Sequence, residues 1–222
     1  QNGTPPDTSP LDTQIPATQQ HAFGLRVLEA LGFDLETGRL DVTTHPFCSG
    51  LAPGDTRLTT RYRDERFTDA LYGTMHECGH GLYEQGLPKT PELFGTPLSD
   101  SISLGIHESQ SRMWENLVGR SRSFWVWALP IANACFNDAL SAYTPEDMTR
   151  AVNTSTPSLI RVEADEGTYN LHVMLRFELE RALISGDLKV ADVPGAWNER
   201  MKSMLGLDVP SNAKGCLQDV HW

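Results

Sequence analysis

Apolar side chains recur at helical spacing over most of this chain, and polar turn residues separate the apolar segments. Between residues 18 and 33 the apolar positions fit one face of an amphipathic helix, with Gly32 as its end. Thr144 is a typical N-cap, because Pro145 and two acidic residues follow it. Similar patterns predict further helices over residues 64–85, 99–129, 130–142, 157–184 and 194–205. The chain is therefore predicted to be mainly α-helical.

One part of the chain departs from this helical pattern. Residues 40–44 and 56–62 are rich in β-branched side chains and alternate roughly between polar and apolar, with a loop containing two glycines and a proline between them. We expect these two segments to form one small antiparallel hairpin beside the helix that follows, as part of the surroundings of a functional site on that helix. Residues 1–16 are expected to form an irregular connector, and residues 17–222 a single catalytic domain.

Composition excludes several classes of protein. With 39% hydrophobic and 21% charged residues, the chain is typical of globular rather than disordered proteins. A net charge of −11 without a Lys/Arg cluster argues against a nucleic-acid partner. No apolar run reaches the ~18 residues that cross a bilayer, so we expect no membrane span. The chain begins without a Met or a secretory signal, and we expect it to be a piece of a longer protein.

The four cysteines, Cys48, Cys78, Cys135 and Cys216, are widely and irregularly spaced. This spacing matches neither a disulfide framework nor a cysteine zinc site. Free thiols of a reducing compartment are the simpler interpretation, and they favour a cytoplasmic location.

The strongest candidate for chemistry is a His-Glu-Cys-Gly-His pentad that begins at His76. Residues four apart share one helix face, so His76 and His80 can bind one zinc ion. Glu77 would project beside the metal, where it could hold and deprotonate a zinc-bound water. Gly79 and Gly81 are unfavourable inside a helix and are usually tolerated where another backbone or a substrate comes close. Two solvent-facing histidines on an ordinary helix are the alternative, and the rarity of the pentad disfavours it.

A catalytic zinc requires a third protein ligand and one open position. Glu108 is the best candidate, because it lies among apolar residues on a helix that can pack antiparallel against the pentad helix. Glu84 lies a further turn beyond His80 and out of reach of the same ion. His107 is an alternative third ligand. Zinc is the default metal for such a donor set, although Co²⁺ or Mn²⁺ can use the same ligands.

The chain resembles the thermostable-carboxypeptidase family of metallopeptidases (peptidase family M32, Taq type) from about residue 20 to its end. Six motifs of that family occur here in order: His45-Pro46-Phe47, Asp55-Thr56-Arg57-Leu58-Thr59, the pentad, His107-Glu108-Ser109, Ile160-Arg161-Val162-Glu163-Ala164-Asp165 and Gly215-Cys216-Leu217-Gln218-Asp219-Val220-His221-Trp222. Members of this family are roughly twice as long, so the resemblance implies a C-terminal-half fragment without the last helices.

The resemblance implies that His76, His80 and Glu108 bind the metal and that Glu77 is the general base and acid. It implies a zincin-type helical fold and, for the full-length form, a homodimer. It also implies residues that hold the substrate or line its groove: His45, Asp55, Arg57, Thr59, Arg161, Gln218 and His221. His221 or Tyr169 could stabilise the oxyanion. A helical pair between Arg161 and Asp165 is the alternative for that arginine.

The sequence therefore predicts a zinc carboxypeptidase that removes the C-terminal residue of a peptide with a free carboxylate. Arg161 favours this activity, because a guanidinium binds carboxylates through two parallel hydrogen bonds. An endopeptidase with the same His-His-Glu site is one alternative. A metal-binding fragment without activity is another, because a partial helical fold would expose apolar faces.

Overall fold

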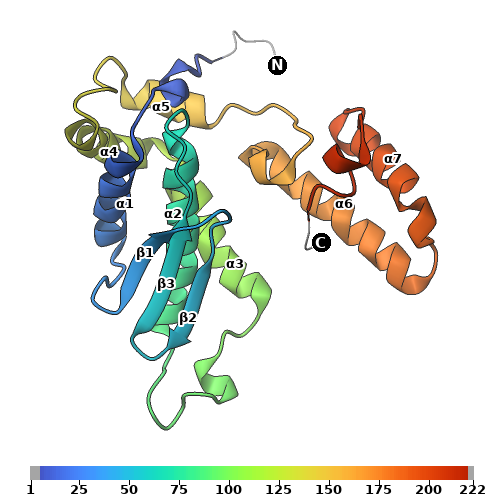
Figure 1. The fold of residues 1–222 in the computed structure, drawn as a ribbon, viewed down its shortest axis with the longest axis horizontal. Coiled ribbons are helices and arrows are strands. Elements are labelled where there is room, and N and C mark those ends of the chain that lie inside the picture. Colours follow the sequence, from blue (N-terminus) through green and yellow to red (C-terminus); the bar gives the residue numbers. More distant parts are fainter. Residues whose placement is uncertain (1–5, 220–222) are drawn as a thin grey trace. The chain divides into compact units, whose positions relative to one another are not determined.

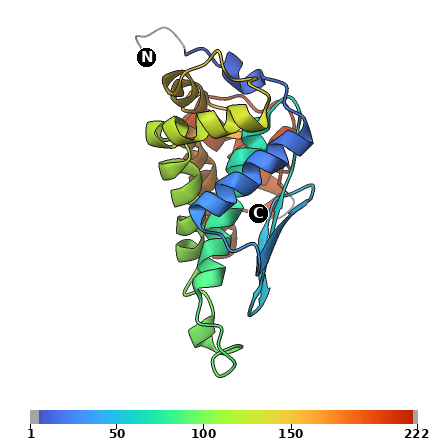
Figure 2. The ribbon, with the colours of Figure 1, turned by 90° about the vertical axis from the view of Figure 1, so that its left-hand side faces the viewer.

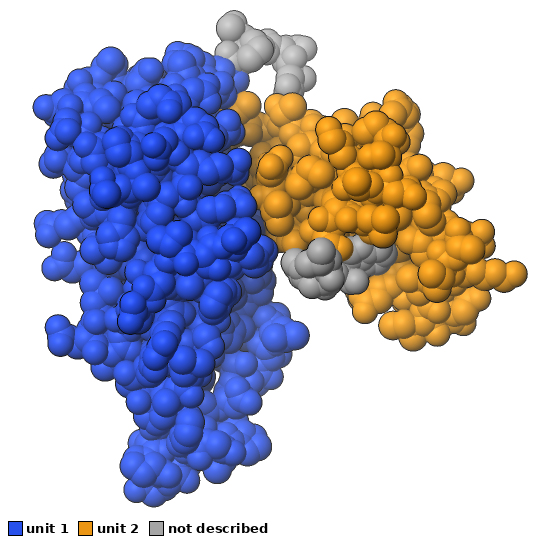
Figure 3. Space-filling view, viewed as in Figure 1, with its two compact units in different colours: residues 1–152 blue, residues 153–222 orange. Residues whose placement is uncertain are grey.

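The structure is a computed structural model that describes residues 6–219 (Figure 1). The chain forms two compact units, Gln1–Val152 and Asn153–Trp222 (Figure 3). The first unit contains α1 (Ala17–Leu31), β1 (Gly38–Val42), β2 (Cys48–Ala52), β3 (Asp55–Thr60), α2 (Phe67–Gly86), α3 (Leu104–Arg112), α4 (Arg122–Cys135) and α5 (Pro145–Val152). The second contains α6 (Glu166–Ser185) and α7 (Val193–Leu205). The prediction of a mainly helical protein with one small sheet is confirmed.

Helix α2 is the centre of the first unit. The sheet packs on one side of α2 through β2 and β3, and α3 packs on the other (Figure 2). The prediction that the strands lie beside this helix is confirmed. Leu28 of α1, Leu40 of β1, Leu58 of β3 and Cys78 of α2 are buried together between these elements. The burial of these side chains stabilises the position of the sheet against α2.

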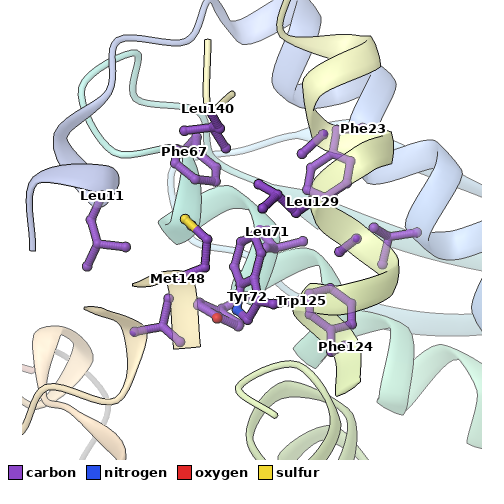
Figure 4. Close-up of a cluster of buried hydrophobic side chains, with 14 of the residues drawn as sticks. Leu11, Phe23, Phe67, Leu71, Tyr72, Phe124, Trp125, Leu129, Leu140 and Met148 are labelled. Atoms are coloured by element: carbon purple, nitrogen blue, oxygen red, sulfur yellow. The ribbon is translucent and has the colours of Figure 1, made fainter. Parts of the chain in front are cut away.

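A larger apolar cluster joins α1, α2, α4 and α5 (Figure 4). Within it, Phe136 makes edge-to-face contacts at ring-centroid distances of 5.3 Å to Phe23 and 5.4 Å to Phe67. Leu11 and Ile15 also belong to the cluster, so the segment before α1 is anchored to the same core. This cluster fixes the N-terminal end of α2, from which the helix extends toward the candidate site.

The sheet has the strand order β1-β3-β2. β1 pairs with β3 in parallel, with Leu40 opposite Leu58. The expected antiparallel pairing of residues 40–44 with 56–62 is therefore wrong. The hairpin instead joins β2 to β3. The β2 sequence Cys-Ser-Gly-Leu-Ala has no β-branched residue, so its strand propensity is weak, whereas a turn with Gly54 at φ 74° returns the chain beside β3.

Several helix boundaries agree with the predictions. Gly32 and Gly186 end α1 and α6 in the left-handed conformation, at φ 87° and 82°. The Thr144 hydroxyl donates to Asp147 Oδ2 at 2.6 Å, and the Asp147 backbone N–H donates to Thr144 Oγ1 at 3.2 Å, as expected of an N-cap for α5. No helix among the described residues combines the length and apolar character that crossing a membrane requires.

Three predicted helices differ from those in the structure. The helix predicted over 99–129 is interrupted, because Ser121 caps a new helix by accepting the Phe124 backbone N–H at 3.1 Å. The separate helix predicted over 130–142 is wrong, because α4 continues through Pro130 and ends at Cys135. Buried residues on both sides of Pro130 offset a cost of about 3 kcal/mol. The helix predicted from residue 157 begins only at Glu166, where the Asp165 side chain accepts the Thr168 backbone N–H.

In the second unit, α6 and α7 pack against each other. The shared cluster consists of buried Leu175, Leu179, Trp197, Met201, Leu205 and Cys216. Cys216 belongs to the segment that follows α7, so this segment is held against the helix pair. Gln218 and Asp219 lie in the same segment.

Candidate metal centre

The two histidines of the pentad project from one face of α2. His76 and His80 lie one helical turn apart, and their ring centroids are 5.0 Å apart. Both side chains are largely buried, with 22% and 16% of their surface exposed. The pairing expected from the sequence spacing is therefore present, and the alternative of two solvent-facing histidines does not fit this burial.

Helix α3 approaches α2 closely at Gly79. The loop after α2 turns the chain back, so that α3 runs along α2 in the opposite direction (Figure 1). A Cβ atom at position 79 would lie 2.5 Å from the Gln110 carbonyl oxygen and 2.6 Å from the Ser111 Cα. Only glycine permits this separation of the two backbones. The expectation that Gly79 allows a close backbone approach is confirmed, and the approach brings Glu108 to the histidines.

Glu108 Oε2 lies 3.3 Å from His80 Nε2 and 3.7 Å from His76 Nε2. One ligand atom from each of the three side chains lies within 4.8 Å of the others. Tetrahedral zinc with bonds near 2.1 Å would separate its donor atoms by about 3.4 Å. Two imidazole nitrogens and a carboxylate at these distances fit a divalent metal ion. The Ser111 hydroxyl holds the same carboxylate, because it donates to Glu108 Oε2 at 3.1 Å.

Each histidine is held at its second ring nitrogen. His76 Nδ1 lies 2.9 Å from Glu115 Oε2, and His80 Nδ1 lies 2.6 Å from His107 Nδ1. These contacts turn the Nε2 atoms toward Glu108 and leave them available to a metal ion. Burial by itself lowers the pKa of His76, but the hydrogen bond and charge of Glu115 outweigh it and raise the pKa above its ordinary value.

Glu115 was not expected to hold His76. It lies on a π-helical stretch, Met113–Val118, that continues directly from α3. Its carboxylate lies 3.4 Å from Arg112 and 3.6 Å from Arg120. The sequence contained one signal for this contact. Glu115 lies two helical turns after Glu108, and residues at that spacing face the same side of a helix.

The position of His107 differs from the one that its alternative role as a third metal ligand would require. One ring nitrogen contacts His80, and the other lies 2.9 Å from Glu84 Oε1. Both of its nitrogen atoms are thus engaged away from Glu108. Glu84 lies outside the candidate metal site, as its position one turn beyond His80 predicted, but it is joined to that site through His107.

Glu77 lies beside the two histidines on α2 and is 6% exposed. Burial raises the pKa of its carboxyl to about 7, with a smaller contribution from the negative charge of Glu108. Among the described residues, no side-chain hydrogen bond or ion pair engages this carboxylate. A carboxyl group with these properties can accept and release a proton near neutral pH.

Two of the expected groove residues of the sheet, Asp55 and Arg57, are paired with each other. Arg57 donates through Nε and Nη2 to both carboxylate oxygens of Asp55, each at 2.9 Å. The Thr59 hydroxyl accepts the Phe47 backbone N–H at 2.9 Å. His45 is exposed in the segment between β1 and β2. Contact of these side chains with a substrate stays a prediction.

In the second unit, Arg161 lies in a short 3-10 turn and contacts the segment after α7. Its Nε donates to Asp219 Oδ2 at 3.2 Å, and its Nη1 donates to the Tyr169 hydroxyl at 2.8 Å. Its backbone N–H donates to Gln218 Oε1 at 2.9 Å. The alternative pairing with Asp165 is wrong, because the Asp165 carboxylate caps α6 instead.

Asp219 also binds Arg176, whose Nε donates to Asp219 Oδ2 at 2.8 Å. Burial by itself raises the pKa of Asp219, but the two guanidinium groups outweigh it and hold this pKa below its ordinary value. Arg176 was not among the expected residues. Its place two helical turns after Tyr169 was the available signal. His221 lies outside the described residues.

Comparisons with known proteins agree with this geometry. A family model described as carboxypeptidase Taq (M32) metallopeptidase matches residues 1–222. The chain is 52% identical over 221 residues to "Thermostable carboxypeptidase 1" of Thermus thermophilus, covering 100% of this chain and 43% of that protein. It is 44% identical over 221 residues to "Carboxypeptidase 1" of Bacillus subtilis, covering 100% of this chain and 44% of that one.

A solved M32 carboxypeptidase from Deinococcus radiodurans R1 superposes with a TM-score of 0.93 and 50% identity, over 99% of this chain and 44% of that one. The chain thus spans less than half the length of these relatives. The match to the family model along the whole chain and the His-His-Glu cluster lead to one assignment: this chain belongs to the carboxypeptidase Taq (M32) family of metallopeptidases.

Proposed function

We propose that this chain carries the catalytic centre of a zinc carboxypeptidase that removes the C-terminal residue of peptides. The observation that carries the proposal is the convergence of three donors, His76 Nε2, His80 Nε2 and the Glu108 carboxylate, beside the buried Glu77. Zinc is the proposed metal because imidazole nitrogen and carboxylate are its usual ligands, although Co²⁺ and Mn²⁺ fit the same set.

A divalent metal at these donors would polarise the scissile carbonyl and lower the pKa of a water molecule. Glu77 has a separate task in the proposed reaction. Its carboxylate takes a proton from the attacking water and then gives this proton to the leaving amine. Its burial and its freedom from a side-chain partner among the described residues support this task. The two histidines stay in place throughout because their Nδ1 atoms are hydrogen-bonded, and the Ser111 hydroxyl helps to hold the Glu108 carboxylate.

A guanidinium can recognise the free C-terminal carboxylate of a peptide, and Arg161 is the proposed residue. Its guanidinium already binds a carboxylate in this structure, that of Asp219, which supports its suitability for this chemistry. We propose that Gln218 and His221 hold the same end of the peptide and that Tyr169 or His221 stabilises the oxyanion. His45, Asp55, Arg57 and Thr59 are proposed to line the groove.

We also propose that residues 17–222 act as one catalytic domain. The homodimer proposed for the full-length form rests on the family resemblance. The proposed cytoplasmic location rests on the four cysteines, which are all free thiols in the structure. Gel filtration of a full-length relative with the same motifs would test the dimer.

The test of the proposed function compares Glu77→Gln with Glu92→Gln, an identical chemical change at an exposed glutamate. Mass spectrometry follows a peptide with a free C-terminus and its C-terminally amidated form, while elemental analysis counts bound metal. We expect the unmodified chain to shorten only the free peptide. Glu77→Gln should retain the metal and lose hydrolysis by about 10²–10⁴-fold, as is usual for a general base, whereas Glu92→Gln should be unaffected.

Other results would support different functions. Equal cleavage of both peptides, or internal cuts, would favour an endopeptidase. One metal ion per chain with no turnover in the unmodified protein would favour a metal-binding fragment without activity. Undiminished hydrolysis by Glu77→Gln would remove Glu77 from the mechanism.

A further inference from the structure

The two histidines of the candidate metal centre are held by chemically different groups. His76 Nδ1 contacts a carboxylate, that of Glu115, at 2.9 Å. His80 Nδ1 contacts a second imidazole, that of His107, at 2.6 Å. An ionised carboxylate can only accept a hydrogen bond from a histidine, whereas an imidazole nitrogen can either donate or accept one. The orientation of His80 therefore depends on which nitrogen of His107 carries the hydrogen.

Hydrogen-bond directions determine the state of His107. A neutral His80 that binds a metal through Nε2 carries its hydrogen on Nδ1. His107 Nδ1 must then accept this hydrogen, so the hydrogen of His107 is on Nε2. His107 Nε2 lies 2.9 Å from Glu84 Oε1, an ionised acceptor that has no hydrogen to donate. Both hydrogen bonds between His80 and Glu84 are thus donated in the same direction, away from His80.

Lys89 completes this chain at its outer end. Its ammonium donates to Glu84 Oε2 at 2.6 Å, so the two carboxylate oxygens have one donor each. The side chains of Lys89 and Glu84 are only 11% and 15% exposed, and that of His107 is 20% exposed. A largely buried ion pair of this kind loses much of its hydration, and this cost offsets the attraction between the two charges. Its presence is therefore not explained by a gain in stability. Its position suggests instead a role in fixing the direction of the hydrogen bonds.

The sheet leaves space for this ion pair. A Cβ atom at Gly50 of β2 would overlap Glu84 Oε2 and lie 2.7 Å from Lys89 Nζ. Any larger residue would displace the carboxylate or the ammonium group. Gly50 is therefore a second, independent feature that fits the Glu84–Lys89 pair, contributed by a different element.

We propose that His107, Glu84 and Lys89 are positioning residues for His80. His80 Nδ1 donates to His107 and His107 Nε2 donates to Glu84, while Lys89 donates to the other carboxylate oxygen of Glu84. Together these hydrogen bonds hold the ring of His80 with Nε2 toward the metal. The proposal rests on the proposed metal site and assigns no contact with the metal to His107. Outer partners of metal-binding histidines commonly change metal affinity by 10–100-fold when they are replaced.

The test uses Glu84→Gln and the double variant Glu84→Gln/Lys89→Met. In the single variant, the introduced amide has one acceptor oxygen and one NH₂ donor group in place of two acceptor oxygens. Its NH₂ group must therefore face either the Lys89 ammonium or the His107 N–H, and two donors then face each other. The double variant removes the cation, so the oxygen of the introduced amide can accept from His107 again. Glu29→Gln, in an exposed ion pair with Arg26, is the matched control.

Two quantities are measured on the full chain. Competition with a chelator gives the zinc dissociation constant, and the ¹⁵N shifts of the zinc-loaded protein show which nitrogen of His107 carries the hydrogen. We expect Nε2–H in the unmodified protein. Glu84→Gln should weaken zinc binding by about 10–100-fold. The double variant should recover most of this loss together with the Nε2–H form, and Glu29→Gln should have no effect.

Wild-type zinc affinity in Glu84→Gln would overturn the positioning role, as would an equal loss in the single and double variants. Hydrogen on Nδ1 of His107 in the zinc-loaded protein would overturn the proposed direction. An unmodified chain that binds no zinc would overturn the proposed function as well, so the two failures are distinguishable.

Discussion

Replacing Gly79 with alanine should separate α3 from α2 and weaken metal binding at the proposed site, although none of the proposed ligands is changed. The added Cβ would lie 2.5 Å from the Gln110 carbonyl oxygen and 2.6 Å from the Ser111 Cα. Non-bonded atoms prefer separations of about 3.5 Å, so α3 must retreat by about 1 Å. These contacts are with backbone atoms, which cannot rotate away as a flexible side chain could. Glu108 lies on the same helix and would move with it.

The magnitude follows from two opposing effects. Overpacking typically costs about 1–3 kcal/mol, whereas alanine in place of glycine inside a helix gains about 1 kcal/mol. The free energy of unfolding should therefore fall by about 0–2 kcal/mol. Metal bonds tolerate deviations of only about 0.2 Å, so a retreat of Glu108 by about 1 Å should weaken zinc binding by at least about 10-fold.

Gly73→Ala is the matched control, because it is the same substitution on the same helix. Its Cβ would have only ordinary contacts, 3.6 Å to Thr60 Oγ1 and 3.8 Å to Pro46 Cγ. It should raise stability by up to about 1 kcal/mol and leave zinc affinity unchanged. Urea unfolding without metal and chelator competition measure the two quantities. If Gly79→Ala binds zinc as tightly as Gly73→Ala and is equally stabilised, the close approach of α3 to α2 is wrong.

Two further predictions concern helix starts. Burial by itself raises the pKa of Asp165, but hydrogen bonds from Ser155, Thr168 and the Thr156 backbone outweigh it and lower the pKa. A lowered folded-state pKa stabilises the fold above the unfolded value of about 3.9, and this contribution is lost as the pH falls through the folded value. Urea midpoints should therefore fall more steeply between pH 6 and pH 3 in the unmodified chain than in Asp165→Asn, and parallel profiles would contradict this cause. Thr144→Ala should cost about 1 kcal/mol through loss of the α5 cap, and an unchanged urea midpoint would contradict that role.

Local spacing predicted the elements whose determinants lie close together in the chain. Helix ends at Gly32 and Gly186 and the cap at Thr144 depend on a few neighbouring residues, and they agree with the structure. Pairing of strands depends on segments farther apart. β1 and β3 were expected to be antiparallel, but β2, with its weak strand propensity, is the segment that forms the hairpin with β3.

Arg161 illustrates the same limit for side chains. Spacing along a helix suggested Asp165 as its partner, but the residues around Arg161 form a 3-10 turn, which removes the helical face that the pairing required. Its partner is Asp219, which the packing of the last segment against α6 and α7 brings to it. No local pattern predicts a contact across such a separation.

Local sequence patterns were sufficient to identify the candidate metal donors. Helix periodicity places His76 and His80 on one face, and an acidic residue on a returning helix was the remaining requirement, which Glu108 meets. The tertiary structure alone decided what surrounds those donors. Glu115 reaches His76 from a π-helical stretch, Gly79 lets α3 approach the backbone of α2, and Gly50 leaves room for the Glu84–Lys89 pair. Periodicity is a property of one helix, whereas these contacts depend on the distances between packed elements.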